Sequence, residues 1–132
     1  MVAAIGPGLL VLLGVGPADG AREVAWMARK LPSLRIFTDD QGLMNLSLEA
    51  IQGSLLLVSQ FTLFGDCRKG NRPSFIEAGP PALAEQLYLE LLQQLRAQLG
   101  TARVGCGVFG AAMQVRLLND GPVTLLLETP AV

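Results

Sequence analysis

With 132 residues, a formal net charge of −1 and 51% hydrophobic residues, the chain has the size and composition of one domain spanning residues 1–132. A general duplex-DNA binder is expected to be strongly basic, so the charge disfavours that function and leaves open a protein that grips only the end of an RNA. The chain has no histidine and only two cysteines, which excludes the usual proton shuttle at neutral pH and a four-ligand zinc site within one chain.

The N-terminal part predicts a buried strand followed by a helix. Residues 8–16 form a Leu/Val run bounded by glycines, which favours a strand covered on both faces. It does not resemble a secretory signal, because no Lys or Arg precedes Arg22, and it is too short to span a membrane. Asp19 is the expected N-cap of the helix, and Pro32 is expected to end it. The apolar stripe of this helix comprises Val24, Met27, Ala28 and Leu31.

The middle of the chain predicts β-structure and then a polar loop. Two short strands are expected at residues 34–38 and 43–48, joined by turn residues. A long β-rich segment follows at residues 54–64. Residues 65–73 are the most polar stretch and are expected to form a loop.

The C-terminal part predicts a second helix and three further strands. Residues 82–99 have an amphipathic pattern with a leucine seam, and Gly100 closes the helix. Strands are expected at residues 104–108, 113–117 and 123–128. Together the elements predict an α+β fold with two main helices and a mixed sheet, curled into a barrel-like form.

The cysteines and the apolar content bear on cell compartment and assembly. Cys67 and Cys106 are isolated, which favours reduced thiols and a cytosolic protein, while a disulfide between them stays open. The high apolar content fits a buried oligomer interface and a tightly packed monomer equally well.

Hydroxyl-bearing residues end the β-rich segment in the motif Ser59-Gln60-Phe61-Thr62. Ser59 and Thr62 are candidate nucleophiles, but an activated hydroxyl needs an adjacent base, and no histidine exists to supply one. As isolated residues they read as ordinary strand hydroxyls. Backbone N–H groups can nevertheless stabilise an oxyanion, and an ester next to a ribose 2′-OH brings its own reactive hydroxyl.

A second unusual stretch is Asn119-Asp120-Gly121-Pro122-Val123-Thr124. A proline at this place fits a kink at the entry to a strand. If the Gly121–Pro122 bond is cis, adjacent carbonyl oxygens can point the same way and accept an ammonium group, but the sequence does not decide between cis and trans.

Taken together, these two motifs resemble those of the D-aminoacyl-tRNA deacylases, also called D-tyrosyl-tRNA deacylases. The resemblance extends from about Ile5 to Glu128 and includes residues 6–15, 35–37, 44–46, 72–75 and 109–115. It implies a cytoplasmic homodimer without cofactor, metal, DNA or membrane partner. The implied reaction is hydrolysis of the ester between a D-amino acid and the 3′ end of tRNA, which proofreads chirality.

The resemblance also implies roles for residues. Those at the reacting ester are Ser59, Gln60, Phe61 and Thr62, with Gln60 and Phe61 helping to form an oxyanion hole. Those that bind substrate are Gly121, Pro122, Met113, Ala111 and Ala112, with Met113 near the adenosine. The Gly121 and Pro122 carbonyls would enter the partner's site, hold the substrate's ammonium and exclude L side chains. Achiral glycine would pass, which makes glycyl-tRNA a second expected substrate.

Some alternatives stay open. Thr62 is a candidate nucleophile in this family, but the missing base favours assistance by the 2′-OH of the RNA. A basic loop with Arg68, Lys69 and Arg72 either contacts phosphate or is simply solvated. Two features depart from the family pattern: members usually begin with an additional strand before residues 8–16, and an acidic or polar residue is common at the position of Ala112. The alternative function is therefore a catalytically silent module that binds the tRNA 3′ end. A Ser/Thr hydrolase of small esters is a third.

Overall fold

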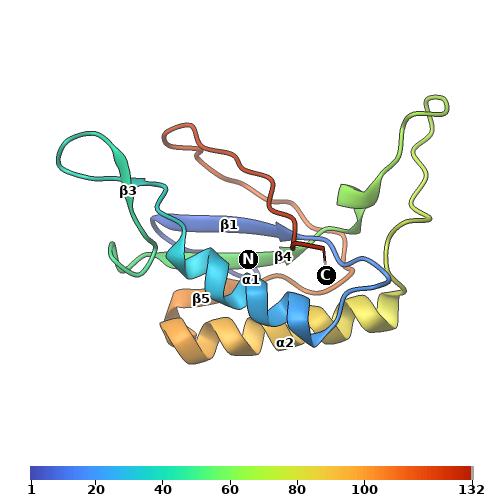
Figure 1. The fold of residues 1–132 in the computed structure, drawn as a ribbon, viewed down its shortest axis with the longest axis horizontal. Helices are drawn as coiled ribbons and strands as arrows, with labels where there is room; N and C mark the ends of the chain where they lie inside the picture. The colour runs from blue at the N-terminus through green and yellow to red at the C-terminus, as the bar shows by residue number, and fades with distance from the viewer. Residues whose placement is uncertain (132) are drawn as a thin grey trace.

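The structure is a computed structural model that describes residues 1–131, and over this range it is an α+β fold with two long helices (Figure 1). The α+β class with two main helices, expected from the sequence, is confirmed. The elements in chain order are β1 (Gly8–Leu13), α1 (Ala21–Ser33), β2 (Phe37–Thr38), β3 (Met44–Leu46), β4 (Ser54–Ser59), η1 (Phe61–Phe64), α2 (Pro81–Leu99), η2 (Thr101–Arg103) and β5 (Val104–Cys106).

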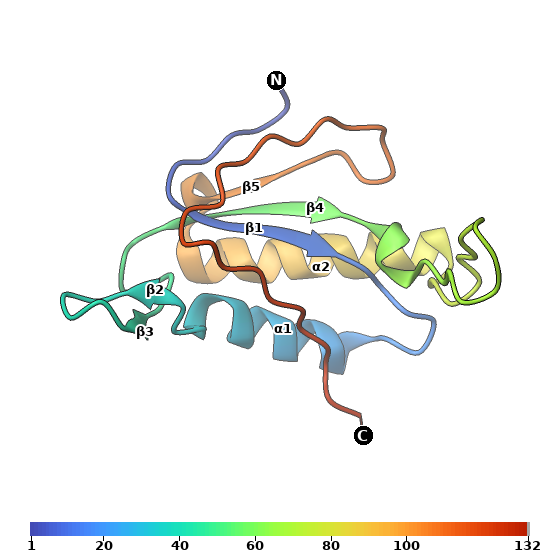
Figure 2. The same ribbon diagram turned by 90° about the horizontal axis from the view of Figure 1, so that it is seen from above.

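The main sheet has the order β1-β4-β5, and its strands are parallel. Parallel neighbours need crossover connections, which α1 and α2 provide, and both helices lie on the same face of the sheet (Figure 2). β2 and β3 form a separate antiparallel pair, so the parallel and antiparallel pairing that the sequence predicts in one mixed sheet is divided between two sheets. The carboxyl ends of β1 and β4 therefore meet at one edge, where the register pairs Leu13 with Ser59.

The core lies between the sheet and the two helices. Leu55 and Leu57 of β4 are fully buried, and they face Leu91 and Leu95 in the same apolar cluster. Removing a buried leucine side chain costs about 2–5 kcal/mol, so this layer holds β4 firmly in place. Among residues 1–131, no helix combines the length and apolar character needed to cross a membrane.

Helix α1 begins one residue later than the sequence predicts. Its N-cap is Gly20, whose N–H donates to the Glu23 carboxylate at 2.8 Å. Asp19 instead accepts the N–H of Gly16 at 2.7 Å and closes the preceding turn. Pro32 was expected to end the helix, but it lies inside the last turn, and Leu34 N–H still bonds the Lys30 carbonyl at 3.1 Å.

Helix α2 agrees with its prediction. It begins with Pro81, a residue favoured at the first helical position because the N–H that proline lacks has no partner there. It ends at Leu99, and Gly100 caps it with a φ of 91°, which suits glycine. The predicted leucine seam is buried at Leu87, Leu91 and Leu95.

The long strand expected at residues 54–64 is wrong in its second half. The last rung is the Gln60 N–H bond to the Leu13 carbonyl at 2.7 Å, and β1 offers no partner beyond it. The chain then turns into η1, which Leu63 N–H closes on the Gln60 carbonyl at 3.2 Å. The expected strands at 34–38, 43–48 and 104–108 are present in shortened form.

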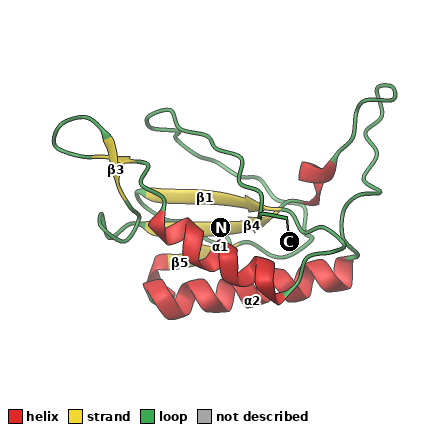
Figure 3. Ribbon diagram, viewed as in Figure 1, coloured by secondary structure: helices red, strands yellow, loops and turns green. Residues whose placement is uncertain are grey.

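The strands expected at residues 113–117 and 123–128 are not formed. Within residues 1–131, no other strand lies beside this segment to complete a hydrogen-bonded ladder, and the last backbone-to-backbone bond before it joins Ala111 N–H to the Val108 carbonyl. Residues 112–131 run instead as an irregular segment over the sheet face opposite the helices (Figure 3). The described residues therefore do not close a barrel.

Buried Tyr88 of α2 joins the sheet to the segment that follows β5. Its hydroxyl lies 3.1 Å from the Leu57 carbonyl oxygen and 3.4 Å from that of Gly107. Burial is the main cause that raises the pKa of Tyr88 from 10.0 to about 12. The hydroxyl thus fixes Gly107 against the carboxyl half of β4.

We expect Tyr88 to make the fold sensitive to alkali. Because the folded pKa exceeds the unfolded one, the stabilisation is complete below pH 10 and is lost as the pH rises towards about 12. Tyr88→Phe should lower the free energy of unfolding by about 1 kcal/mol at neutral pH and flatten its decline above pH 10, as measured by urea denaturation. An unchanged alkaline slope in Tyr88→Phe would contradict this role.

Candidate functional site

The first candidate motif forms the carboxyl end of β4 and the turn after it. Ser59 is the last residue of β4, Gln60 precedes η1, and Phe61 and Thr62 begin η1. The Phe61 side chain is 59% exposed. The first N–H groups of a helical turn have no acceptor within it, so those of Phe61 and Thr62 are available to a ligand.

A loop after β5 lies against the same edge. Gly110 N–H donates to Ser59 Oγ at 3.3 Å, and the positive φ of Gly110 (71°) belongs to the turn that Ala111 N–H closes. A Cβ on Gly107 would lie 2.6 Å from Met113 Sδ, so the Met113 side chain packs directly against this glycine. The structure therefore brings Ala111, Ala112 and Met113, which follow Gly110 directly, to the edge that holds Ser59.

Among residues 1–131, no basic side chain is hydrogen-bonded to the hydroxyls at this edge. Thr62 Oγ1 accepts a hydrogen bond from Gln60 Nε2, and Ser59 Oγ accepts the one from Gly110. The next carboxylate along the chain, Asp66, is bound by both arms of Arg68, at 2.9 and 2.7 Å. These bonds lower the pKa of Asp66 to about 2, so it stays ionised and is a poor proton acceptor at neutral pH.

The second candidate motif lies elsewhere in the chain. The Gly121–Pro122 peptide is cis, both residues are exposed, and Gly121 has a φ of 150°. Asn119 shapes the bend by accepting Val123 N–H at 3.2 Å and donating to Thr124 Oγ1 at 3.1 Å. The bend of the C-terminal segment lies near the start of β1, whereas η1 lies at the other end of the sheet (Figure 1) (Figure 2). One chain does not bring the two motifs together.

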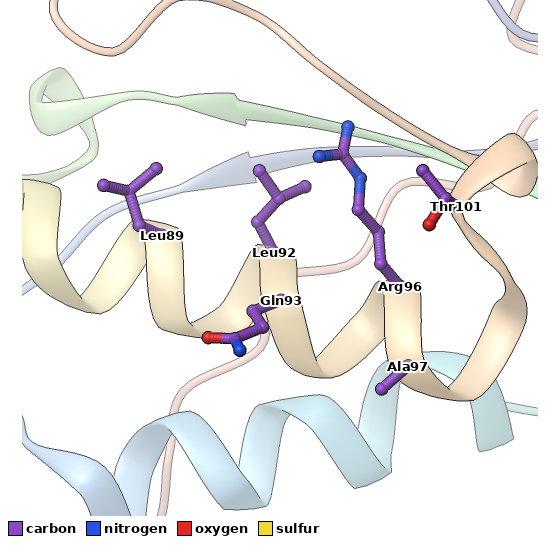
Figure 4. A pocket seen from close by; sticks show the side chains of 6 residues that line it. All are labelled: Leu89, Leu92, Gln93, Arg96, Ala97 and Thr101. Carbon is purple, nitrogen blue, oxygen red and sulfur yellow. The ribbon is translucent and has the colours of Figure 1, made fainter.

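A shallow depression on α2 lies apart from both motifs (Figure 4). Its one charged side chain, Arg96, bonds the Val104 carbonyl at 3.2 and 3.1 Å and approaches Cys106 Sγ at 3.8 Å. This arginine ties α2 to β5 and is not free for a ligand. Its lining residues are Leu89, Leu92, Gln93, Arg96, Ala97 and Thr101.

No group of acidic, cysteine or histidine side chains suited to a metal ion occurs in the described part of the chain. Cys67 and Cys106 are both free thiols, so the disulfide left open by the sequence is not formed. What remains at the end of β4 is a set of main-chain N–H groups and small polar side chains. This arrangement can stabilise an oxyanion, but it offers no strong side-chain base.

The fold and candidate site thus define a small α+β protein that presents main-chain amides and hydroxyls at the carboxyl end of a parallel sheet. Comparison with known families then identifies it: residues 1–128 match the family described as D-Tyr-tRNA(Tyr) deacylase. The chain belongs to this family. The sequence-based prediction of the family, and of a D-aminoacyl-tRNA deacylase enzyme, is confirmed.

Curated relatives support the same assignment. The D-aminoacyl-tRNA deacylase of Myxococcus xanthus is 60% identical over 129 residues, covering 98% of this chain and 83% of that protein. The Desulfatibacillum aliphaticivorans protein of the same name is 56% identical, with 97% and 86% covered.

Two solved structures share the fold. One, titled c-Myc DNA Unwinding Element Binding Protein, is 44% identical with a TM-score of 0.91 and covers 98% of this chain and 87% of its own. Another, titled as a probable eukaryotic D-amino acid tRNA deacylase, is 21% identical with a TM-score of 0.72, covers 85% and 80%, and supports the fold alone.

Sequence reasoning missed Gly110 and Tyr88. The N–H of Gly110 orients Ser59, and the Tyr88 hydroxyl holds Gly107 beside Met113. A glycine soon after a strand end was a usable signal for Gly110. Tyr88 lies within the predicted amphipathic helix at residues 82–99, and nothing in the local sequence marks where its hydroxyl points.

Proposed function

We propose that this chain hydrolyses the ester of D-aminoacyl-tRNA at the edge formed by residues 59–62, releasing the D-amino acid and tRNA. The observation that carries the proposal is a backbone-built site, without a bonded side-chain base, in a member of the D-Tyr-tRNA(Tyr) deacylase family. Such a site suits an aminoacyl ester, which is already activated and needs modest help. We place the reaction in the cytoplasm and treat residues 1–132 as one functional domain.

The chemistry we propose uses the substrate's own ribose. Water adds to the ester carbonyl, the terminal 2′-OH relays the proton to the leaving 3′ oxygen, and the C–O ester bond breaks. The N–H groups of Phe61 and Thr62 stabilise the oxyanion, each contributing about 3 kcal/mol to the transition state. Ser59 and Gln60 keep the edge in shape through their bonds to Gly110 and Thr62.

A second copy of the chain completes the proposed site. Within one chain the bend around residue 120 and η1 lie at opposite ends of the sheet, so this bend can reach such a site only in a partner. The unpaired backbone of residues 112–131 and its exposed leucines support a homodimer. A partner chain would supply hydrogen bonds to this backbone and would bury the leucine side chains. Leu118 is 91% exposed and Leu126 is 77% exposed.

In this dimer, the carbonyl oxygens of Gly121 and Pro122 accept the substrate's ammonium group. Both residues are exposed and available to a partner. An amino group held by rigid carbonyls leaves space on one side of the α-carbon only, so a D side chain fits and an L side chain does not. Glycine has no side chain, and glycyl-tRNA is therefore a second substrate. Ala111, Ala112 and Met113 border the adenosine.

The test is release of amino acid from D-, L- and glycyl-tRNA and from a D-aminoacyl-tRNA whose terminal ribose lacks the 2′-OH. We expect release from the D- and glycyl-tRNAs only. Cleavage of the deoxy substrate at full rate would exclude assistance by the RNA. Binding of D-aminoacyl-tRNA without release would show a silent module that binds the tRNA 3′ end.

Thr62→Ala is expected to retain activity within about 10-fold of wild type, because the proposal gives this hydroxyl no proton-transfer role; loss of such a role costs about 10²–10⁴-fold. Initial rates on D-aminoacyl-tRNA measure the effect. Ser59→Ala is the matched control, since it removes the other hydroxyl at this edge. A loss of several thousand-fold in Thr62→Ala alone would contradict the proposal and assign this hydroxyl a part in the chemistry.

A further inference from the structure

The polar loop of residues 65–75 projects from the same edge as the proposed ester site. Its base is closed by two backbone hydrogen bonds between Asp66 and Ser74, at 2.8 and 2.9 Å. The Phe61 and Phe75 rings meet edge to face, with centroids 5.1 Å apart. Figure 1 shows the loop rising beyond η1, away from the helices. Whatever is attached to a substrate bound at Phe61 therefore has this loop as a neighbour.

The loop carries an excess of positive charge in a chain of net charge −1. It holds three basic residues and one acidic residue, which leaves the rest of the chain at −3. Asp66 forms a bidentate ion pair with Arg68, and the remaining cations of the loop are Lys69 and Arg72. Both are exposed, and neither forms an ion pair with any other described residue. Two cations thus stand unneutralised beside the site.

We propose that Lys69 and Arg72 bind phosphodiester groups of the single-stranded 3′ end of the tRNA, next to the ester. The inference rests on the proposed function, which places the terminal adenosine at residues 59–62. A strand leading to that adenosine carries one negative charge per nucleotide, and in this proposal it runs along the projecting loop, which adjoins Phe61 through Phe75. Arg68 contributes less, because its guanidinium is already committed to Asp66.

Salt dependence provides the test. Each phosphate contact to single-stranded RNA adds about 0.7 to the slope of log affinity against log salt. Lys69→Gln combined with Arg72→Gln should therefore reduce that slope by about 1.4, so that raising salt from about 50 to 200 mM weakens the double variant about sevenfold less than wild type. The measurements are KM for D-aminoacyl-tRNA and Kd for a short single-stranded RNA with the same 3′ sequence.

A substrate without phosphates separates this role from a structural one. D-Aminoacyl-adenosine should be hydrolysed by the double variant with a KM within about twofold of wild type, because it has no phosphate to lose. Arg29→Gln combined with Lys30→Gln is the matched control. It removes the same two charges from α1, where Lys30 lies over the Trp26 ring, and should leave the slope unchanged.

Two results would overturn the proposal. One is an unchanged slope of log affinity against log salt in the double variant, which would show that the loop is solvated and does not contact phosphate. The other is an equal loss on tRNA and on D-aminoacyl-adenosine, which means a role in shaping the site. If wild type hydrolyses neither substrate, the proposed function fails. The salt dependence of the Kd for the short RNA, compared between wild type and the double variant, still tests whether the loop binds phosphate.

Discussion

Replacing Phe61 by proline should lower kcat for D-aminoacyl-tRNA by about 10²–10³-fold relative to Phe61→Ala, because proline deletes one oxyanion donor and no other polar group. The fold allows this substitution. Phe61 is the first residue of η1, where proline is tolerated, and Gln60 has a φ of −149° and ψ of 79°, outside the helical region that a following proline disfavours. KM should change little, since the donor acts on charge that develops in the transition state.

Phe61→Ala is the necessary control, because both variants lose the ring that packs on Phe75. Any effect of that lost contact on the loop or on substrate binding is common to both, and their ratio isolates the N–H group. Far-ultraviolet circular dichroism and the unfolding midpoint should agree between the two. Equal kcat values for Phe61→Pro and Phe61→Ala would exclude this amide as an oxyanion donor.

The helices could be predicted from sequence because each carries its signals within a short stretch. Helix α2 has its leucine seam and its closing glycine in one continuous segment, and the structure agrees with both, although the helix begins one residue earlier, at Pro81. Helix α1 was displaced by one residue, since Asp19 found a better partner in Gly16 than in the helix it precedes. A capping residue can close a turn or a helix, and its sequence does not reveal which.

Strand limits depended on neighbours that a sequence pattern does not show. The apolar run through residue 64 continues past Ser59, but the ladder stops where β1 ends, so the chain turns there into η1. Residues 113–117 and 123–128 have the alternation of strands and no strand beside them in the described chain. Alternation predicts a capacity for pairing, and pairing itself requires a partner.

The candidate site shows the same division. Residues 59–62 were predicted as a unit because they are contiguous and follow a buried strand. The approach of Gly110 to Ser59 joins residues 51 positions apart, which no local pattern contains. The separation of η1 from the bend around residue 120 also follows only from the fold. It raises the question whether the two motifs meet across two subunits.

Subunit complementation answers that question. Gly121→Val should reduce D-aminoacyl-tRNA hydrolysis about 100-fold or more, comparable to losing one oxyanion donor, because a side chain at a φ of 150° distorts the exposed bend. The variant should fold normally, since Gly121 is exposed and the atoms that an added Cβ would meet belong to Val123 of the same bend. Phe61→Pro has an intact bend and a defective ester site, and Gly121→Val has the reverse. Neither variant alone is expected to be active.

When the two variants are mixed and allowed to exchange subunits, activity should return to about a quarter of the wild-type value. Half of the dimers are then mixed, and in each the intact ester site of one chain receives the intact bend of the other, while the second site is doubly defective. If both motifs served the same chain, every site in the mixture would carry one defect and no activity would return. The recovered fraction therefore distinguishes a site shared between subunits from one confined to a single chain, and a mixture of Phe61→Pro with itself fixes the background.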